Sequence, residues 1–254
     1  PALTPHRQLL VDVSAIARTD LKTGIQRVVR ALVHEFIKAP PPGFRVEPVY
    51  MTSEGNAWHY RYARAWTCGV LGIPAGWAED EAAEFGAGDV LLVADFTSGL
   101  LVEGQRTGMF QVMRNAGVKV VFTVYDLLPI EMPDMFPPGT AQMHAAWLSA
   151  ATAAADVAVC ISQSVATAVT EYLEAASPKR ARPLKVDWFH LGANLDQSAP
   201  TGGLPDGAAK VLSELTARPS FLMVGTVEPR KGYAQTVAAF ERLWEQGHDL
   251  NLVI

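Results

Sequence analysis

Short apolar segments alternate with helical segments along most of this 254-residue chain, and this alternation restricts the fold more than any other feature. The valine-rich segments 9–13, 89–95 and 118–124 have the length and composition of buried strands. Between the strands, segments such as Ile25 to Ile37 place apolar side chains at the spacing of one helix face. Strands that alternate with helices predict an α/β chain with a doubly wound parallel sheet, covered by helices on both faces.

The alternation of strand and helix segments is interrupted after residue 192. Segment 193–208 is rich in glycine, proline and serine and has little periodicity, which is typical of a linker. Beyond it a strand, a helix and the beginning of another strand follow, and one β-α-β unit buries too little apolar surface to form its own core. We expect a domain over 1–192, a linker over 193–208 and the first, incomplete β-α-β unit of a second α/β domain over 209–254.

Composition and charge exclude several classes of protein. The chain is 49% hydrophobic, which excludes intrinsic disorder, and its net charge of −5 argues against nucleic acid as a partner. The sequence contains neither an apolar run of membrane-spanning length nor a secretory signal, so we expect a cytoplasmic protein. Cys68 and Cys160 cannot form a disulfide framework, and the histidines lack metal-ligand spacing. We therefore expect no metal.

Gly24 stands between the first predicted strand and the helix that follows it. Backbone N–H groups at such a helix start can bind an anion, so this loop is a candidate phosphate site with Arg27 nearby. The alternative is an ordinary turn with a solvated arginine. The basic residues Arg27, Arg30 and Lys38 could also contact anionic lipid headgroups, but a solvated face is the favoured explanation. Neither a dinucleotide fingerprint nor a P-loop is present, so no cofactor is expected.

Asp126 lies at the carboxyl end of the apolar strand 118–124 and precedes a proline-rich loop over 128–139. Open α/β sheets bind ligands at the carboxyl ends of their strands, where a carboxylate can accept a hydrogen bond from a substrate hydroxyl or orient a base. The alternative interpretation is that Asp126 caps its own loop through an Asx turn.

A second loop, which contains Gly225, Thr226, Arg230 and Lys231, also follows a predicted strand and precedes a helix. Two adjacent cations at a helix start oppose the helix dipole unless an anion lies between them. Arginine can bind phosphate oxygens with two hydrogen bonds, and lysine acts as a point charge. The pattern therefore favours a diphosphate site over a solvated basic loop.

Together these segments carry a resemblance to a known family. The segments VDVS, TGIQRVVRAL, VYDLLPIEMPDMFP, ADVAVCISQSVATAV, WFHLGA and FLMVGTVEPRKGY follow one another as in the group 1 glycosyltransferases. These are retaining enzymes of the GT-B fold, in which two Rossmann-like domains face each other across a cleft. The resemblance covers nearly the whole chain.

The resemblance implies roles for the candidate residues. The N-terminal domain would hold the acceptor and the C-terminal domain the nucleotide-diphosphate sugar. Gly24 would face the donor diphosphate, and Lys231 would neutralise that diphosphate as it leaves, which is where much of the catalysis should lie. A metal is not required if cations do this work.

Three departures from the family pattern are visible. Tyr125 stands where the family often has histidine, and Thr226 stands where many members have arginine, a difference that Arg230 could compensate. The paired glutamates that bind the donor sugar in this family would lie beyond residue 254. We therefore expect this chain alone to bind the donor weakly and to be inactive.

The sequence thus predicts a retaining hexosyltransferase, with mannose as a candidate sugar, in bacterial polysaccharide assembly. Its partners would be a nucleotide sugar and a glycan or lipid-linked acceptor, and it would act in the cytoplasm, with the inner face of the membrane as a candidate location. Two alternatives remain open at this point. One is a non-catalytic α/β module that binds a carbohydrate or a protein partner, and the other is a sugar-nucleotide epimerase of related fold.

Overall fold

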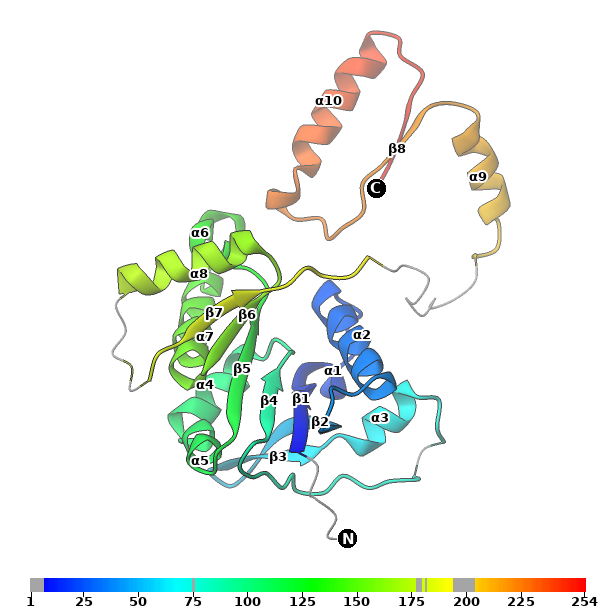
Figure 1. Ribbon diagram of the computed structural model, residues 1–254. Helices are drawn as coiled ribbons and strands as arrows, with labels where there is room; N and C mark the ends of the chain where they lie inside the picture. Colours follow the sequence, from blue (N-terminus) through cyan, green and yellow to red (C-terminus); the bar gives the residue numbers. More distant parts are fainter. Residues whose placement is uncertain (1–6, 75, 177–179, 181, 194–203) are drawn as a thin grey trace. The chain divides into compact units, whose positions relative to one another are not determined.

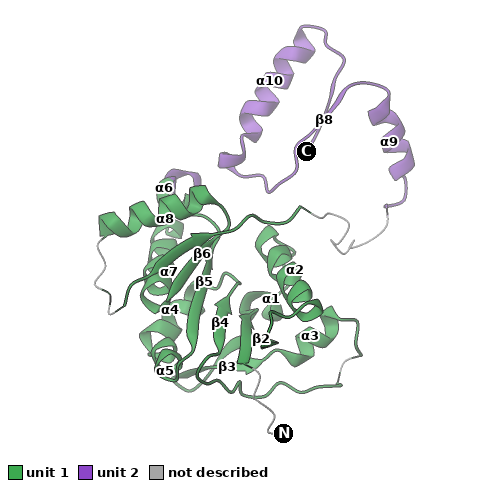
Figure 2. Ribbon diagram, viewed as in Figure 1, with its two compact units in different colours: residues 1–131, 139–198 green, residues 132–138, 199–254 purple. Residues whose placement is uncertain are grey.

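The computed structural model describes residues 7–74, 76–176, 180, 182–193 and 204–254. It divides into two compact units (Figure 2). Unit 1 contains residues 1–131 and 139–198, and unit 2 contains residues 132–138 and 199–254. The predicted linker over 193–208 falls largely on residues 194–203, which lie outside the described residues, so the predicted domain boundaries stay a prediction.

Unit 1 is built on a seven-stranded sheet in the order β3-β2-β1-β4-β5-β6-β7 (Figure 1). Its strands are β1 (Arg7–Asp12), β2 (Phe44–Glu54), β3 (Ala57–Tyr62), β4 (Val90–Val93), β5 (Lys119–Val124), β6 (Val157–Cys160) and β7 (Lys185–Trp188). All neighbouring strands are parallel except β2 and β3. The predicted Rossmann-like α/β fold is confirmed, with an antiparallel strand at one edge.

The antiparallel edge is a hairpin. Glu54 pairs with Ala57, so only Gly55 and Asn56 form the turn. Gly55 has a φ of 60°, and it occupies the first central position, where type II′ hairpin turns place glycine. A two-residue turn of this kind joins only antiparallel strands, which explains why β3 departs from the parallel pattern.

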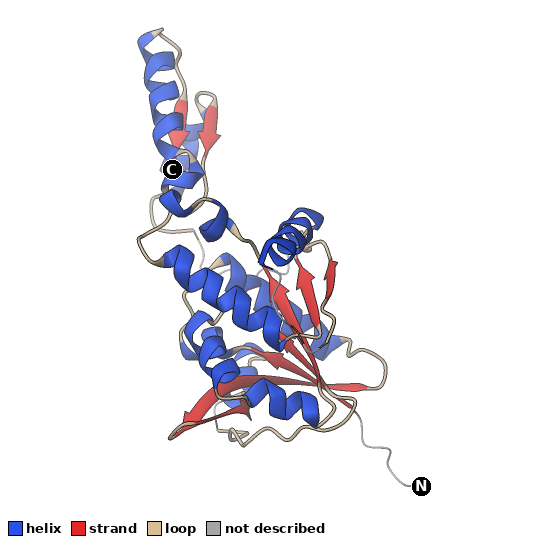
Figure 3. Cartoon of the chain, turned by 90° about the vertical axis from the view of Figure 1, so that its left-hand side faces the viewer, coloured by secondary structure: helices blue, strands red, loops and turns tan. Residues whose placement is uncertain are grey.

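Helices cover both faces of the sheet, as Figures 1 and 3 show. They are α1 (Ser14–Arg18), α2 (Gly24–Lys38), α3 (Arg64–Val70), α4 (Ser98–Arg106), α5 (Met109–Asn115), α6 (Leu128–Glu131), α7 (Thr140–Ala154) and α8 (Gln163–Ala176). Leu9, Val11 and Val13 pack with α2 in one core cluster, whereas Leu10 belongs to the cluster beneath α4, α5 and α7. Because side chains alternate across a strand, β1 contributes to both cores.

Two helical details differ from the expectation. The segment before Asn115, expected as one helix, is divided into α4 and α5 because Gly108 adopts a left-handed φ of 80°. The loop expected over 128–139 contains the single turn α6 and the 3₁₀ helix η1 (Pro133–Met135), which belongs to unit 2.

Unit 2 contains α9 (Ala208–Thr216), β8 (Ser220–Leu222), the 3₁₀ helix η3 (Pro229–Lys231), α10 (Tyr233–Glu245) and β9 (Asn251–Val253). The strands β8 and β9 form a separate two-stranded parallel sheet. The β-α-β pattern was expected, and α9 was not. All three β8 residues are exposed, including Phe221 at 51% and Leu222 at 69%.

Across the described parts of both units, no helix is long and apolar enough to cross a bilayer.

Candidate functional site

The carboxyl ends of β1 and β4 mark the point at which the chain reverses its direction across the sheet. From β1 the chain continues to β2 on one side, and β4, β5, β6 and β7 follow on the other side. Open α/β sheets bind their ligands at such a switch point, outside the carboxyl ends of the strands. Two acidic residues, Asp12 and Asp95, lie there.

Asp95 fixes the turn that follows β1. Its Oδ2 accepts hydrogen bonds from the backbone N–H groups of Ala15 and Ile16, each at 2.8 Å, and its Oδ1 accepts one from the N–H of Phe96. Burial raises the pKa of Asp95, and these three donors offset part of that rise. The carboxylate therefore ties the beginning of α1 to the end of β4.

Asp12 is fully buried and joins three strands. Its Oδ2 accepts a 2.6 Å hydrogen bond from the Tyr60 hydroxyl, and its Oδ1 accepts one from the N–H of Ser14. The Ser14 hydroxyl in turn accepts from the N–H of Met51. Burial raises the pKa of Asp12 to about 6, against the effect of these hydrogen bonds. Burial, followed by the neighbouring Asp12 charge, raises the pKa of Tyr60 strongly.

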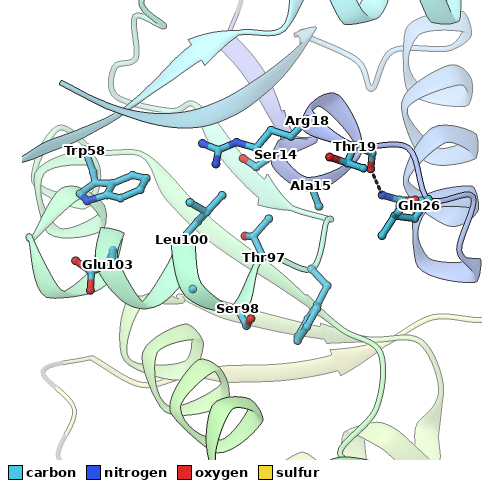
Figure 4. Close-up of a pocket in the computed structure, with 13 residues that line it drawn as sticks. Ser14, Ala15, Arg18, Thr19, Gln26, Trp58, Thr97, Ser98, Leu100 and Glu103 are labelled. Carbon is cyan, nitrogen blue, oxygen red and sulfur yellow. Dashed lines mark hydrogen bonds between the residues drawn. The ribbon is translucent and has the colours of Figure 1, made fainter. Parts of the chain in front are cut away.

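A pocket of about 560 Å³ opens beside this polar cluster (Figure 4). It is lined by side chains from α1, from the beginnings of α2 and α4, and from β3. They include Ser14, Arg18, Thr19, Gln26, Trp58, Phe96, Thr97, Leu100 and Glu103. The pocket volume falls in the range of about 300–1,000 Å³ that is usual for small-molecule sites. The pocket therefore occupies the position at which this fold class binds ligands.

Gly24 is the first residue of α2, next to this pocket. The helix start is capped, because Thr23 Oγ1 accepts from the N–H of Gln26 and Gln26 Oε1 accepts from the N–H of Thr23. Gly24 is exposed, and a Cβ at this position would have no atom within 4 Å. Arg27 is exposed one turn further along α2. The predicted contact of Gly24 and Arg27 with a diphosphate stays a prediction.

Asp126 follows β5, the neighbour of β4 in the sheet. Its half-buried carboxylate accepts a 3.2 Å hydrogen bond from the N–H of Leu128, as in the Asx turn considered above. Its carbonyl oxygen lies 3.0 Å from Nε2 of the buried His144. The Asx turn uses one lone pair of one carboxylate oxygen, so a contact with substrate is compatible with it, and the catalytic role stays a prediction.

Tyr125 points into the protein. Its hydroxyl donates a 2.7 Å hydrogen bond to the Ala94 carbonyl, and only 8% of the residue is exposed. Burial, helped by the Asp95 charge, raises the pKa of Tyr125. Tyr125 therefore ties β5 to the end of β4.

In unit 2, Gly225 lies close to the beginning of α10. Its φ is 154°, and its carbonyl accepts a 2.8 Å hydrogen bond from the hydroxyl of Tyr233, the first residue of α10. A Cβ on Gly225 would lie 3.4 Å from that hydroxyl. The neighbouring Thr226 is exposed. The structure thus joins the predicted loop to the helix start.

Arg230 and Lys231 belong to η3, directly before α10. Arg230 Nη2 lies 2.7 Å from Glu228 Oε2, and its guanidinium lies 5.2 Å from the centre of the Phe136 ring, also in unit 2. Lys231 is exposed, and no ion pair involves it among the described residues. Since no side chain caps α10, the backbone N–H groups of its first turn and Lys231 are available to an anion.

Three curated relatives match almost the whole chain, and each is a serotype-specific mannosyltransferase WbdA of Escherichia coli. Two are 43% identical over 250 residues and the third is 42% identical over 251 residues, which in every case is 98% of this chain. The resemblance to glycosyltransferases is confirmed. The chain spans about 30% of the length of these relatives. No family profile matches the chain.

The sequence patterns did not single out the two acidic residues at the switch point, Asp12 and Asp95. Asp12 is the last residue of β1 and Asp95 lies shortly after β4. Both therefore stand at the end of an apolar strand, which is the signal that singled out Asp126, so both could have been found. Trp58 and Thr97 carry no comparable signal, because only the sheet order brings them to one pocket. Within the described ranges, no group of three or more acidic, histidine or cysteine side chains could hold a metal ion.

Proposed function

We propose that this chain forms the acceptor-side domain and the beginning of the donor domain of a retaining mannosyltransferase. The enzyme would move mannose from a nucleotide-diphosphate sugar to a glycan or lipid-linked acceptor in bacterial polysaccharide assembly. The proposal rests on one observation above all, the 43% identity to a mannosyltransferase over 98% of the chain. In this proposal, residues 1–192 hold the acceptor and residues 209–254 contribute to the donor site.

The donor side would depend on the beginning of α10. In transfer, the bond between the anomeric carbon and the diphosphate oxygen breaks, and negative charge develops on the leaving diphosphate. Exposed Lys231 and the uncapped first turn of α10 supply positive charge and N–H donors to such an anion. Arg230 contributes a second cation, although its guanidinium is paired with Glu228 in the absence of a substrate. These groups stabilise the leaving group without a metal ion.

The acceptor side would use the strand ends of unit 1. Asp126 keeps carboxylate lone pairs for an acceptor hydroxyl, and the hydrogen bond from Leu128 holds its side chain in place. Gly24 would face the donor diphosphate from unit 1, and a Cβ at this position would have no atom within 4 Å among the described residues. We place the enzyme in the cytoplasm at the inner face of the membrane, with no nucleic-acid partner.

A transfer assay tests the proposal. The protein expressed from its full reading frame is incubated with a panel of nucleotide sugars and a mannose trisaccharide acceptor. We expect transfer of mannose alone, and a product whose new linkage keeps the anomeric configuration of the donor by NMR. The 254-residue chain by itself should show at most weak donor turnover.

Each alternative gives a different result. Inversion of the anomeric configuration would overturn the retaining mechanism. Conversion of the nucleotide sugar without an acceptor would indicate an epimerase. Binding of a carbohydrate without any turnover by the full-length protein would indicate a non-catalytic module.

A further inference from the structure

The Thr97 hydroxyl is an unpartnered polar group in the wall of the switch-point pocket. Thr97 is 7% exposed and occupies the position before α4, but its side chain makes no capping hydrogen bond to that helix. Its Oγ1 is buried and has no hydrogen-bond partner among the residues that the structure describes. A buried hydroxyl without a partner costs about 1–3 kcal/mol, so a protein rarely keeps one unless a ligand or a water satisfies it.

The side chains around Thr97 form a surface with both apolar and polar parts. Figure 4 shows Thr97 reaching from the beginning of α4 towards Ser14 and Ala15, with Leu100 and the ring of Trp58 on one side. Trp58 is half-buried, so one part of its indole rests on the core and another part faces the pocket. Such a pocket suits a ring that has an apolar face and hydroxyl groups at its edge.

The charges in the pocket favour a neutral ligand over an anion. Arg18 donates from Nη2 to the Met51 carbonyl at 2.7 Å, and its remaining N–H groups can donate to a ligand. The only acidic side chain in the lining, Glu103, receives two hydrogen bonds from Arg106 on one oxygen. One cation and one carboxylate thus border the same space. A hexose satisfies N–H and hydroxyl donors without adding charge.

We propose that the switch-point pocket binds one neutral hexose residue of the acceptor glycan, with Thr97 Oγ1 bonded to a sugar hydroxyl and Trp58 beneath the ring. The inference rests on the proposed function for its choice of glycan. It goes further in assigning the acceptor subsite to Thr97, Trp58 and Arg18. Thr97 then determines specificity, because a site built around a hydroxyl rejects analogues that lack it.

Direct binding tests the inference without any donor. The probes are a mannose trisaccharide and, separately, inorganic phosphate, added to the ¹⁵N-labelled 254-residue chain. The indole N–H resonance of Trp58 is identified by its absence in Trp58→Phe. We expect the trisaccharide to shift this resonance, and we expect phosphate to leave it unchanged.

Thr97 and Thr107, which flank the two ends of α4, supply a matched pair of variants. Thr97→Val keeps the shape of the side chain and removes the hydroxyl, and Thr107→Val makes the same change at an exposed residue outside the pocket lining. We expect Thr97→Val to weaken trisaccharide binding about tenfold or more and Thr107→Val to change it less than about twofold. Because no described residue hydrogen-bonds the Thr97 hydroxyl, Thr97→Val should unfold at the same or a higher urea concentration than the parent chain.

The outcomes separate this inference from the proposed function. No trisaccharide shift at Trp58, or equal affinity for Thr97→Val and the parent chain, overturns the sugar pocket even if the full-length enzyme transfers mannose. A phosphate shift at Trp58 overturns the neutral ligand. Trisaccharide binding that Thr97→Val weakens supports the pocket even if no transfer is found, which would overturn the transferase alone.

Discussion

Strands β4 and β8 are both mainly apolar but have very different surroundings. The β4 sequence is VLLV and the β8 sequence is SFL, and each strand precedes a candidate loop. In unit 1, β4 lies between β1 and β5, and Leu91 is fully buried. In the described part of unit 2, β8 pairs with β9 alone, and Leu222 is 69% exposed. An apolar strand can therefore be buried or exposed. It is buried only where other strands and helices pack against it.

A pair of leucine-to-alanine substitutions tests this comparison and should give the largest change in the free energy of unfolding. We expect Leu91→Ala to lower the free energy of unfolding of unit 1 by about 2–5 kcal/mol, because it leaves a cavity in a packed core. Leu222→Ala should change unit 2 by less than about 0.5 kcal/mol, since its side chain is largely exposed. Amide hydrogen exchange measures the two units separately. Equal losses in both units would contradict the exposed state of β8.

The next prediction concerns the loop after β8 and the rate of transfer. If Lys231 stabilises the leaving diphosphate, Lys231→Ala in the full-length protein should lower the rate of mannose transfer about 10²–10³-fold. Lys210, on α9 of the same unit, is 4.0 Å from Glu214 and serves as the control. Steady-state kinetics with nucleotide sugar measure both variants. A Lys231→Ala variant as fast as Lys210→Ala would remove Lys231 from the catalytic residues.

The two units also differ in buried charge. Asp12 of unit 1 is fully buried, whereas no acidic or basic side chain in the described part of unit 2 is buried. The folded pKa of Asp12, about 6, lies above its ordinary value of 3.8, so the native state binds more protons between these values. Its contribution to stability is therefore complete below about pH 4 and is lost as the pH rises through 6.

The contribution of Asp12 to stability can be measured as a change in the free energy of unfolding with pH. The rise in pKa corresponds to about 3 kcal/mol of unfolding free energy. We expect Asp12→Asn to gain about that much stability relative to the parent chain between pH 4 and pH 7.5, as measured by urea unfolding at several pH values. A constant difference between the two proteins at all pH values would contradict a raised pKa.

The smallest effect concerns the two helix starts. α2 is capped by Thr23, whereas α10 begins at Gly232 with a φ of 74° and has no side-chain cap. We expect Thr23→Ala to destabilise unit 1 by about 1 kcal/mol and to speed amide exchange in the first turn of α2. Thr226→Ala, an exposed threonine near the start of α10, should leave the exchange of α10 unchanged. Equal exchange of α2 in Thr23→Ala and the parent chain would contradict the capping role.

Local patterns predicted the elements well where the signal was strong. The helix from Ile25 to Ile37 was predicted because its apolar residues recur at the spacing of one helix face, and it forms α2. The division of the helix before Asn115 was missed, because a single glycine permits a left-handed residue without demanding one. The helix α9 was missed because it adjoins a segment rich in glycine and proline. Among the candidate residues, Asp126 and Lys231 were singled out from the sequence, and Asp12 and Asp95 were not.

The α/β class, the two candidate loops and the kinship with glycosyltransferases all follow from the amino-acid sequence, because strand alternation, turn residues and motifs can be recognised in short segments. Which loops meet depends on the three-dimensional fold. By pairing β1 with β4, the sheet brings the Asp95 carboxylate to the N–H of Ala15, 80 residues away, and brings Trp58 and Thr97 to one pocket. The order of the strands depends on burial and pairing between distant segments, and no local pattern records it.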